Sequence, residues 1–247
     1  MKTIVRPLFV ILLTCGLVAL GVGAFVLWPQ MDLAASGLFY TPGRGFFLRD
    51  VLPVRVLGWL VYYGARALGG ALAVSGLIAA LRRRPFLRLS GKAWLFLLLG
   101  LLLGPGLVAN VVFKDHWGRA RPREVMEFGG AAHFTSPLVL SGECASNCSF
   151  VSGDGAFGFY LPSFAYVVLP RRRRSVFWGG MALGGLFGAA RILAGAHFLS
   201  DVLFAAVFML LTSAFLHAVL YGWRETASCW RSWLPLGKRR AVSLINS

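Results

Sequence analysis

Six long apolar runs constrain the fold of this chain more than any other feature of its sequence. Each is long enough to cross a bilayer as a helix, which takes roughly 20 residues. They lie at about 7–28, 54–81, 92–113, 150–169, 175–195 and 199–222. With 57% hydrophobic residues and a mean hydropathy of +0.71, the 247-residue chain falls outside the range of soluble globular proteins. We therefore expect an all-α, polytopic membrane protein with six transmembrane helices in a single domain over residues 1–247.

The first apolar run follows Lys2 and Arg6 and so resembles a secretory signal peptide. It is about 22 residues long and lacks a small-x-small cleavage site, so we interpret it as an uncleaved first span. Thr14 precedes Cys15 where a lipoprotein signal carries a smaller residue. We therefore expect Cys15 to be a free thiol.

Basic residues gather on one side of the membrane when six spans are threaded. Sixteen of the 25 lysines and arginines then share that side, in the N-terminal segment, at 82–92, at 171–174 and in the C-terminal tail. The positive-inside rule makes this side cytoplasmic and places both termini there. All acidic residues except Glu225 fall on the other side or at its membrane face. Residues 114–149 are therefore predicted to form a periplasmic loop.

The formal net charge of +16 could indicate binding to nucleic acid or to anionic lipid. Proteins that bind nucleic acid concentrate basic residues on one folded face, whereas here they are divided among short loops. Attraction to anionic lipids explains such loops better. We therefore expect membrane lipids as partners, no nucleic acid and no obligate protein partner.

Two segments outside the spans complete the outer side. Residues 29–53 mix aromatic and turn residues, and we expect a short amphipathic helix along the membrane interface. In the loop at 114–149, Cys144 and Cys148 lie where oxidation is possible, and the sequence leaves open whether they form a disulfide. Cys229 is expected to be free.

Polar residues cluster in three segments at the outer ends of spans. In the first, "KDHWGRARPRE", Lys114 and Arg121 are seven residues apart, so on a helix both would face one way. The second, "SFVSGDG", opens a span with Ser152 and Gly153. A helix N-terminus of this kind offers free backbone N–H groups and the positive end of the helix dipole to a phosphate.

The third segment, "ARILAGAHFLSD", contains Arg191, His197 and Asp201. If a helix continues through His197 and Asp201, the carboxylate reaches one imidazole nitrogen and the other nitrogen faces outward. This is the arrangement of a nucleophile or base with the group that orients it. An unpaired guanidinium near the end of an apolar span is costly, so Arg191 needs a partner or an anionic ligand.

A simpler interpretation of the first segment is that its cations bind lipid headgroups at the interface. These cations are Lys114, Arg119, Arg121 and Arg123. An isolated histidine is likewise more often structural than catalytic. The presence of Arg191 and Asp201 on either side of His197 favours a functional site instead.

Taken in order, the three segments resemble the signature motifs of the type 2 phosphatidic acid phosphatase superfamily. The pattern is K-x6-R-P from Lys114 to Pro122, S-G-x from Ser152 to Asp154 and R-x5-H-x3-D from Arg191 to Asp201. Their order, their spacing and the six-span topology agree with that family. The surrounding sequence, including "DLAASGLFY", "EFGG" and "NCSFVSG", resembles a bacterial subgroup that contains lipid A phosphatases.

The resemblance implies a metal-free phosphatase that forms a phosphohistidine. His197 would attack phosphorus, and Asp201 would fix its tautomer and stabilise the imidazolium. The groups that would bind the phosphate oxygens in place of magnesium are Lys114, Arg121, Ser152, Gly153 and Arg191. The sequence contains no carboxylate cluster or His/Cys set with convincing metal-ligand spacing, so we expect neither a metal nor a cofactor.

Asp154 departs from the family pattern, in which a histidine follows the Ser-Gly pair and protonates the leaving alkoxide. One interpretation keeps Asp154 as the catalytic acid, protonated beside a dianionic phosphate. The other is a pseudophosphatase that binds phosphorylated lipids without releasing phosphate. We favour the first, because a dead site would have little reason to keep the nucleophile, its orienting carboxylate and the cations.

These features together predict a phosphatase of the bacterial inner membrane that acts at the periplasmic face on a lipid phosphate. Lipid A is the expected substrate, at its 1- or 4′-phosphate. Undecaprenyl pyrophosphate and phosphatidylglycerophosphate are alternative substrates that the same motifs would serve. A transporter is disfavoured, because neither paired half-helices nor an inverted repeat is evident in the sequence.

Overall fold

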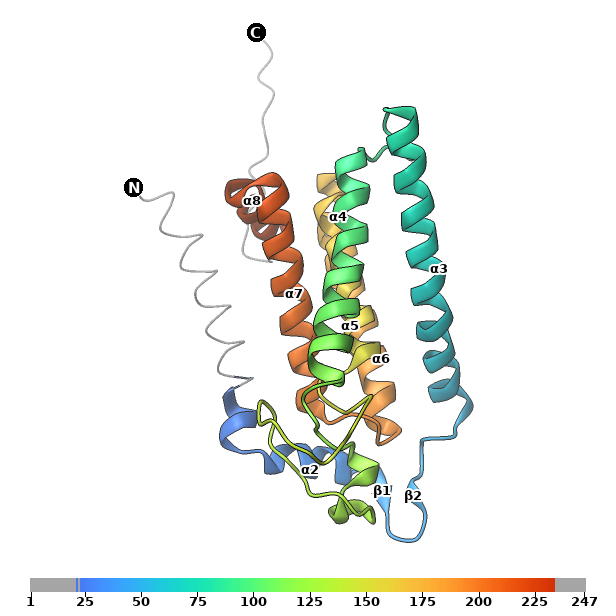
Figure 1. Cartoon of the computed structure of the whole chain (residues 1–247), viewed down its shortest axis with the longest axis vertical. Helices are drawn as coiled ribbons and strands as arrows, with labels where there is room; N and C mark the ends of the chain where they lie inside the picture. Colours follow the sequence, from blue (N-terminus) through green and yellow to red (C-terminus); the bar gives the residue numbers. More distant parts are fainter. Residues whose placement is uncertain (1–20, 22, 234–247) are drawn as a thin grey trace, which may run out of the picture.

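The computed structural model describes residue 21 and residues 23–233, which form a bundle of helices along one axis (Figure 1). Within these described residues, four helical segments are long and apolar enough to cross a membrane. They are α3 (Leu52–Arg82), the segment Gly91–Lys114, α6 (Pro170–Leu193) and α7 (Leu199–Tyr221). The chain is therefore a mostly helical, multi-pass membrane protein.

The other two expected spans are not shown as membrane-crossing helices. The run at about 7–28 lies mostly outside the described residues. The run at 150–169 contains a short helix, α5 (Gly153–Tyr160), continued by the 3-10 helix η4 (Leu161–Tyr166). Pro162 in the first turn of η4 lacks a backbone N–H, which disfavours a regular α-helix there. This run is thus shorter as a helix than its apolar length predicts.

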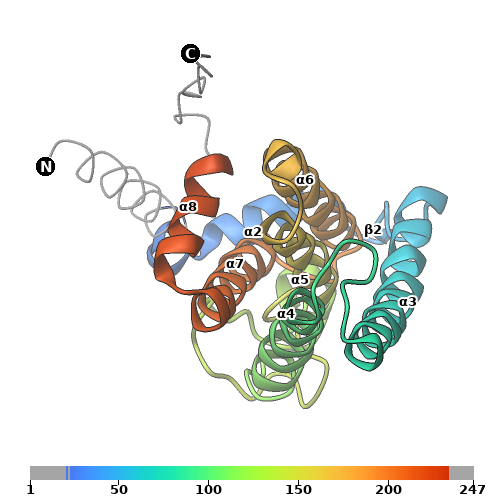
Figure 2. The ribbon, with the colours of Figure 1, turned by 90° about the horizontal axis from the view of Figure 1, so that it is seen from above.

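The helix α5 lies in the interior of the bundle, among its neighbours α4, α6 and α7 (Figure 2). Small residues spaced four apart on α6 allow this close packing. A Cβ atom on Gly184 would lie 2.3 Å from Phe159 of α5, and one on Gly188 would lie 2.3 Å from Val202 of α7. The glycines therefore allow α6 to pack closely against α5 and against the start of α7.

The segment Gly91–Lys114 consists of α4 (Gly91–Leu101) and a π-helix, η1 (Leu102–Lys114). Ser90 caps α4, because its hydroxyl accepts a hydrogen bond of 3.2 Å from the Ala93 amide. Pro105 lies inside η1 and cannot donate to the helical ladder. Lys114 is the last residue of this π-helix.

Short elements cover the end of the bundle where η1 finishes. They are α2 (Gln30–Gly37), the hairpin β1 (Tyr40–Thr41) and β2 (Gly45–Phe46), and the 3-10 helices η2 (Pro122–Glu124) and η3 (Met126–Phe128). A short helix is confirmed within 29–53, but its buried residues are the polar Asp32 and Ser36. It is held to the bundle by polar contacts, which an interfacial amphipathic helix does not require.

The two ends of the bundle differ in character. The hairpin, α2 and the loop of residues 115–152 lie at one end, and the arginine-containing turn between α3 and α4 lies at the other (Figure 1). The last described helix, α8 (Trp223–Trp233), is also at the far end. All three polar segments identified in the sequence therefore meet at one end of the molecule.

Candidate active site

The first segment brings Lys114 and Arg121 together, but not on one helix face as expected. The helix ends at Lys114, and Arg121 has an extended backbone, so the two do not share a helix face. Asn147 joins them instead. Its Oδ1 accepts a hydrogen bond of 3.0 Å from Lys114 Nζ, and its carbonyl oxygen accepts one of 2.5 Å from Arg121 Nη2.

Asn147 belongs to a small loop that a disulfide closes. The bond joins Cys144 to Cys148, which answers the question that the sequence left open. The Cys148 amide also donates to the Lys114 carbonyl oxygen at 3.0 Å. The disulfide loop thus holds both cations, while Cys229 is free and buried and Cys15 lies outside the described residues.

The second segment forms the N-terminus of α5. Ser152 is its N-cap, and the hydroxyl accepts a hydrogen bond of 3.2 Å from the Gly155 amide. The amides of Gly153 and Asp154 precede the first intrahelical hydrogen bond and so remain available to a ligand. A Cβ atom on Gly153 would lie 3.2 Å from Lys114 Nζ, so the ammonium group lies directly beside this helix end.

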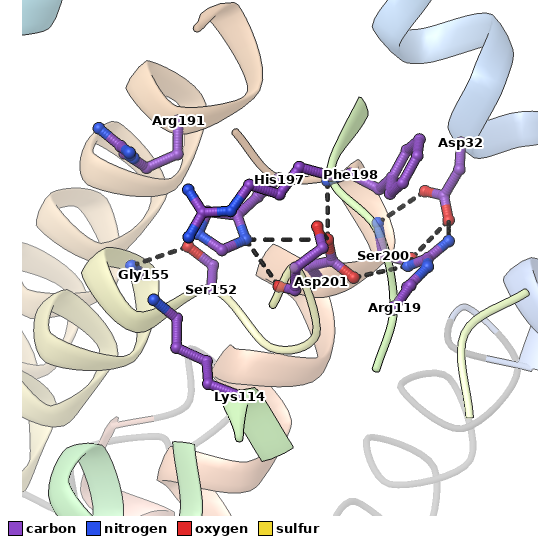
Figure 3. Close-up of polar contacts among 12 residues, drawn as sticks. Asp32, Lys114, Arg119, Ser152, Gly155, Arg191, His197, Phe198, Ser200 and Asp201 are labelled. Carbon is purple, nitrogen blue, oxygen red and sulfur yellow. Dashed lines mark hydrogen bonds and ion pairs between the residues drawn. The ribbon is translucent and has the colours of Figure 1, made fainter. Parts of the chain in front are cut away.

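The third segment brings His197 to the same place, between α6 and α7. Gly195 has a φ of +61°, a left-handed conformation that favours glycine and ends α6. Figure 3 shows Lys114, Ser152 and Arg191 on one side of His197 and Asp201 on the other. His197 is 1% exposed, and burial lowers its pKa from 6.5 to about 4. The imidazole is therefore neutral at ordinary pH.

The hydrogen bond that orients His197 comes from an unexpected partner. His197 Nδ1 lies 2.7 Å from the Ser149 carbonyl oxygen and 3.8 Å from Asp201 Oδ2. A carbonyl oxygen can only accept, so Nδ1 carries the proton and Nε2 carries the lone pair. The condition of a continuous helix through His197 and Asp201 is not met, because α7 begins at Leu199.

Asp201 is held by a buried network rather than by His197 alone. Its Oδ2 accepts hydrogen bonds from the Ser149 hydroxyl at 2.5 Å and from the Phe198 amide at 2.8 Å. Its Oδ1 pairs with Arg119 Nη1 at 2.5 Å. This carboxylate therefore positions the loops on both sides of His197 while it remains close to the imidazole.

Arg119 connects this network to α2. Its Nη2 lies 2.8 Å from Asp32 Oδ2, and all three charged side chains in the chain Asp32–Arg119–Asp201 are fully buried (Figure 3). The interpretation of Arg119 as a headgroup-binding cation is therefore wrong. Sequence reasoning missed the roles of Asp32, Asn147 and Ser149, which lie in segments that it quoted only as context or as a loop.

Asp154 and Arg191 form an ion pair at the rim of the site. Asp154 Oδ2 lies 3.3 Å from Arg191 Nε, and each side chain is about a quarter exposed, at 28% and 26%. Arg191 thus has the partner that its position in an apolar helix requires. Asp154 and Arg191 both line the same cavity.

A cavity of about 820 Å³ connects the charged groups to an apolar wall. Lys114, Gly153, Asp154 and Arg191 line its charged part. The rest runs between α3 and the helices α4, η1 and α5, past apolar residues that include Leu101 and Phe157. A ligand with a phosphate and a hydrocarbon part fits such a cavity better than a purely polar ligand.

Among the sequence-predicted residues, Lys114, Arg121, Ser152, Gly153, Asp154, Arg191, His197 and Asp201 are brought together at one end of the bundle. His116 and His133, two histidines of the loop, are exposed. His217 lies in α7, hydrogen-bonded to Thr226 at 2.7 Å. His197 is the histidine that lies beside Lys114, Ser152 and Arg191 (Figure 3).

Comparisons with known proteins cover the same residues. A sequence model described as the PAP2 superfamily matches residues 93–225, which include all three segments. The chain is 34% identical over 204 residues to a lipid A 4′-phosphatase of Francisella tularensis subsp. novicida (strain U112), covering 81% of this chain and 91% of the relative. A protein of the same name from Rhizobium leguminosarum is 47% identical over 102 residues, 41% of this chain and 44% of the relative. No solved structure matches the chain.

Proposed function

Because the chain belongs to the PAP2 superfamily, whose enzymes are metal-independent phosphatases, we propose that it removes the 4′-phosphate of lipid A. The observation that carries the proposal is the cavity, which joins Lys114, Asp154 and Arg191 to an apolar wall between α3 and the rest of the bundle. The names of relatives at 34–47% identity support lipid A and the 4′ position.

His197 acts as the nucleophile in the proposed reaction. The Ser149 carbonyl holds the proton on Nδ1, so the lone pair of Nε2 can attack phosphorus. A P–N bond forms while the bond from phosphorus to the lipid oxygen breaks. Asp201, at 3.8 Å, stabilises the imidazolium that develops. Water then attacks the phosphohistidine, which releases phosphate and restores the neutral histidine.

The phosphate oxygens are bound by charges and amides in place of a metal ion. Lys114 and Arg121 are positioned by Asn147, and Arg191 reaches the site from the end of α6. The Ser152 hydroxyl and the Gly153 amide add the N-terminus of α5. Such a preorganised clamp stabilises the charge of the transition state, which is the main requirement of phosphoryl transfer.

Asp154 supplies and takes up the proton. When phosphate binds Arg191, the Asp154 carboxyl lies beside a dianion, which favours its protonated form. It then gives the proton to the leaving lipid oxygen. In the second step it accepts a proton from the attacking water, so no net proton is left on the protein.

The proposed topology has six spans, both termini in the cytoplasm and the active site at the periplasmic face of the bacterial inner membrane. The separation of the site from the arginine-containing turns supports this orientation (Figure 1). A cysteine introduced at Ala131, an exposed residue of the loop, should react with an impermeant thiol reagent in intact cells. An unreactive Ala131→Cys together with a reactive Arg174→Cys would show the opposite orientation.

The substrate is tested by phosphate release from a panel of purified lipids. We expect release from lipid A that carries a 4′-phosphate and much less from lipid A with only a 1-phosphate, from undecaprenyl pyrophosphate and from phosphatidylglycerophosphate. Activity should persist in EDTA. Faster phosphate release from another lipid would identify that lipid as the substrate in place of lipid A. Tight binding of every lipid without phosphate release would indicate a pseudophosphatase.

A further inference from the structure

A second group of cations lies at the outer mouth of the cavity, outside the three motif segments. Arg49 precedes α3, Arg55 lies in the first turn of α3, and Arg123 lies in η2. All three line the cavity that also contains Lys114 and Arg191. The mouth therefore continues the positive charge of the active site toward the solvent.

These mouth cations are poorly neutralised. Arg123 Nε lies 3.9 Å from Glu124 Oε1, close to the limit for an ion pair. Within residues 23–233, neither Arg49 nor Arg55 has a carboxylate oxygen within 4.0 Å. Asp50 also lines the mouth, so the three arginines have Asp50 and Glu124 as nearby carboxylates. Like charges gathered in this way are unfavourable unless an anion joins them.

The electrostatic effects of the mouth cations extend to the active site. Burial lowers the pKa of Arg123, and the charges of Arg49 and Arg191 lower it further, against the effect of Glu124. Arg49, Arg123 and Arg191 line one cavity of about 820 Å³, so a single headgroup in that cavity can contact the mouth and the active site.

We propose that Arg49, Arg55 and Arg123 form a second anion-binding subsite, which holds another phosphate of the lipid headgroup while the scissile phosphate lies at Arg191. Guanidinium groups bind phosphate through paired hydrogen bonds, which makes arginine suited to this role. The inference rests on the proposed function for the position of the scissile phosphate. It adds a preference for headgroups that carry two phosphates.

The test compares lipid A that carries both phosphates with lipid A that carries only the 4′-phosphate. Wild-type kcat/KM should be about tenfold or more higher for the bisphosphorylated lipid, since a hydrogen bond to a charged group contributes about that factor. Arg49→Gln combined with Arg123→Gln should raise KM for the bisphosphorylated lipid about tenfold and leave the monophosphorylated lipid unchanged.

Arg44→Gln is the matched control, because Arg44 is an exposed arginine of the hairpin that does not line the cavity. It should leave both lipids unaffected. Equal losses on both lipids in the double variant, or no preference in the wild type, would overturn the subsite.

Failure of the proposed function gives a different result. If the wild type released phosphate from neither lipid, the affinity of each lipid for the purified protein would still test the subsite. The wild type should bind the bisphosphorylated lipid more tightly, and the double variant should bind the two lipids equally. Equal affinities of the wild type for the two lipids would overturn the inference, whether or not the protein releases phosphate.

Discussion

Asp154 Oδ2 lies 3.3 Å from Arg191 Nε, so the residue that departs from the family pattern is paired with one of the cations proposed to bind phosphate. In the proposed reaction, a phosphate at Arg191 competes with this carboxylate. Asp154 would then meet the leaving group in the substrate complex, which would link substrate binding to proton delivery through one guanidinium.

Substitution of Asp154 should affect substrates according to their leaving groups. Asp154→Asn removes the proton donor, so turnover of a lipid phosphate should fall by roughly 10²- to 10⁴-fold. An aryl phosphate leaves without protonation and should lose much less. Comparison of kcat for the two substrates measures this difference. Equal losses on both would assign Asp154 to positioning of Arg191 or of the phosphate.

The disulfide loop should influence activity through Asn147. Asn147→Ala removes the acceptor that holds Lys114 Nζ at 3.0 Å, and we expect kcat/KM to fall about tenfold. A double-mutant cycle with Lys114→Met tests whether Asn147 acts through Lys114. If Asn147 acts through Lys114, its effect largely disappears in the Lys114→Met background. Additive losses would contradict this coupling.

Reduction of the disulfide gives an independent test of the same loop. A reductant should lower kcat/KM of the wild type and leave a Cys144→Ser, Cys148→Ser variant, already less active, unchanged. The reason is that Asn147 and the Cys148 amide both contact Lys114 from this loop. Equal activity in the oxidised and reduced protein would show that the loop holds Lys114 without the covalent bond.

Arg119 should contribute more to stability than any exposed arginine. Arg119→Met leaves Asp32 and Asp201 buried without their cation, and the loss of one partner from such a group costs about 3–5 kcal/mol. Thermal unfolding in detergent measures this loss. Arg44→Met, an exposed change in the hairpin, serves as the control. If Arg119→Met left the thermal unfolding midpoint unchanged, the buried network would not contribute to stability.

Stability should also depend on pH through His197. Burial lowers its pKa from 6.5 to about 4, so between these values the unfolded chain binds a proton that the folded protein does not. Stability therefore falls as pH falls through this window, by up to about 1.4 kcal/mol per pH unit, and is unaffected by this group above pH 6.5. The wild-type unfolding midpoint should fall more steeply than that of His197→Gln. Parallel curves would contradict the burial of a neutral histidine.

Spacing in the sequence predicted which residues meet but not how they are held. Lys114, Ser152, Arg191 and His197 could be identified because each stands at an end of an apolar run. The i, i+4 rule placed Asp201 near His197, although the helix between them begins only at Leu199. Apolar length alone overestimated the helix at 150–169, because Pro162 and the glycines of α6 favour a short buried helix.

The supporting contacts could not be predicted, because they join segments far apart in the chain. Asp32 and Arg119 are 87 residues apart, and His197 and Ser149 are 48 residues apart. Local periodicity contains no information about such pairs. Within a polar segment, the neighbouring residues in the sequence do not distinguish a buried arginine from an exposed one. Arg119 was therefore grouped with the interfacial cations.

The most direct test of the account is to trap the covalent intermediate. Acid-labile, alkali-stable phosphate should appear on the wild-type protein when turnover of a labelled lipid phosphate is stopped under alkaline denaturing conditions, and peptide mapping should locate it on His197. His197→Ala should carry no label and lose at least about 10³-fold in kcat. Turnover without a labelled protein, or a label on another residue, would contradict the role of His197 as nucleophile.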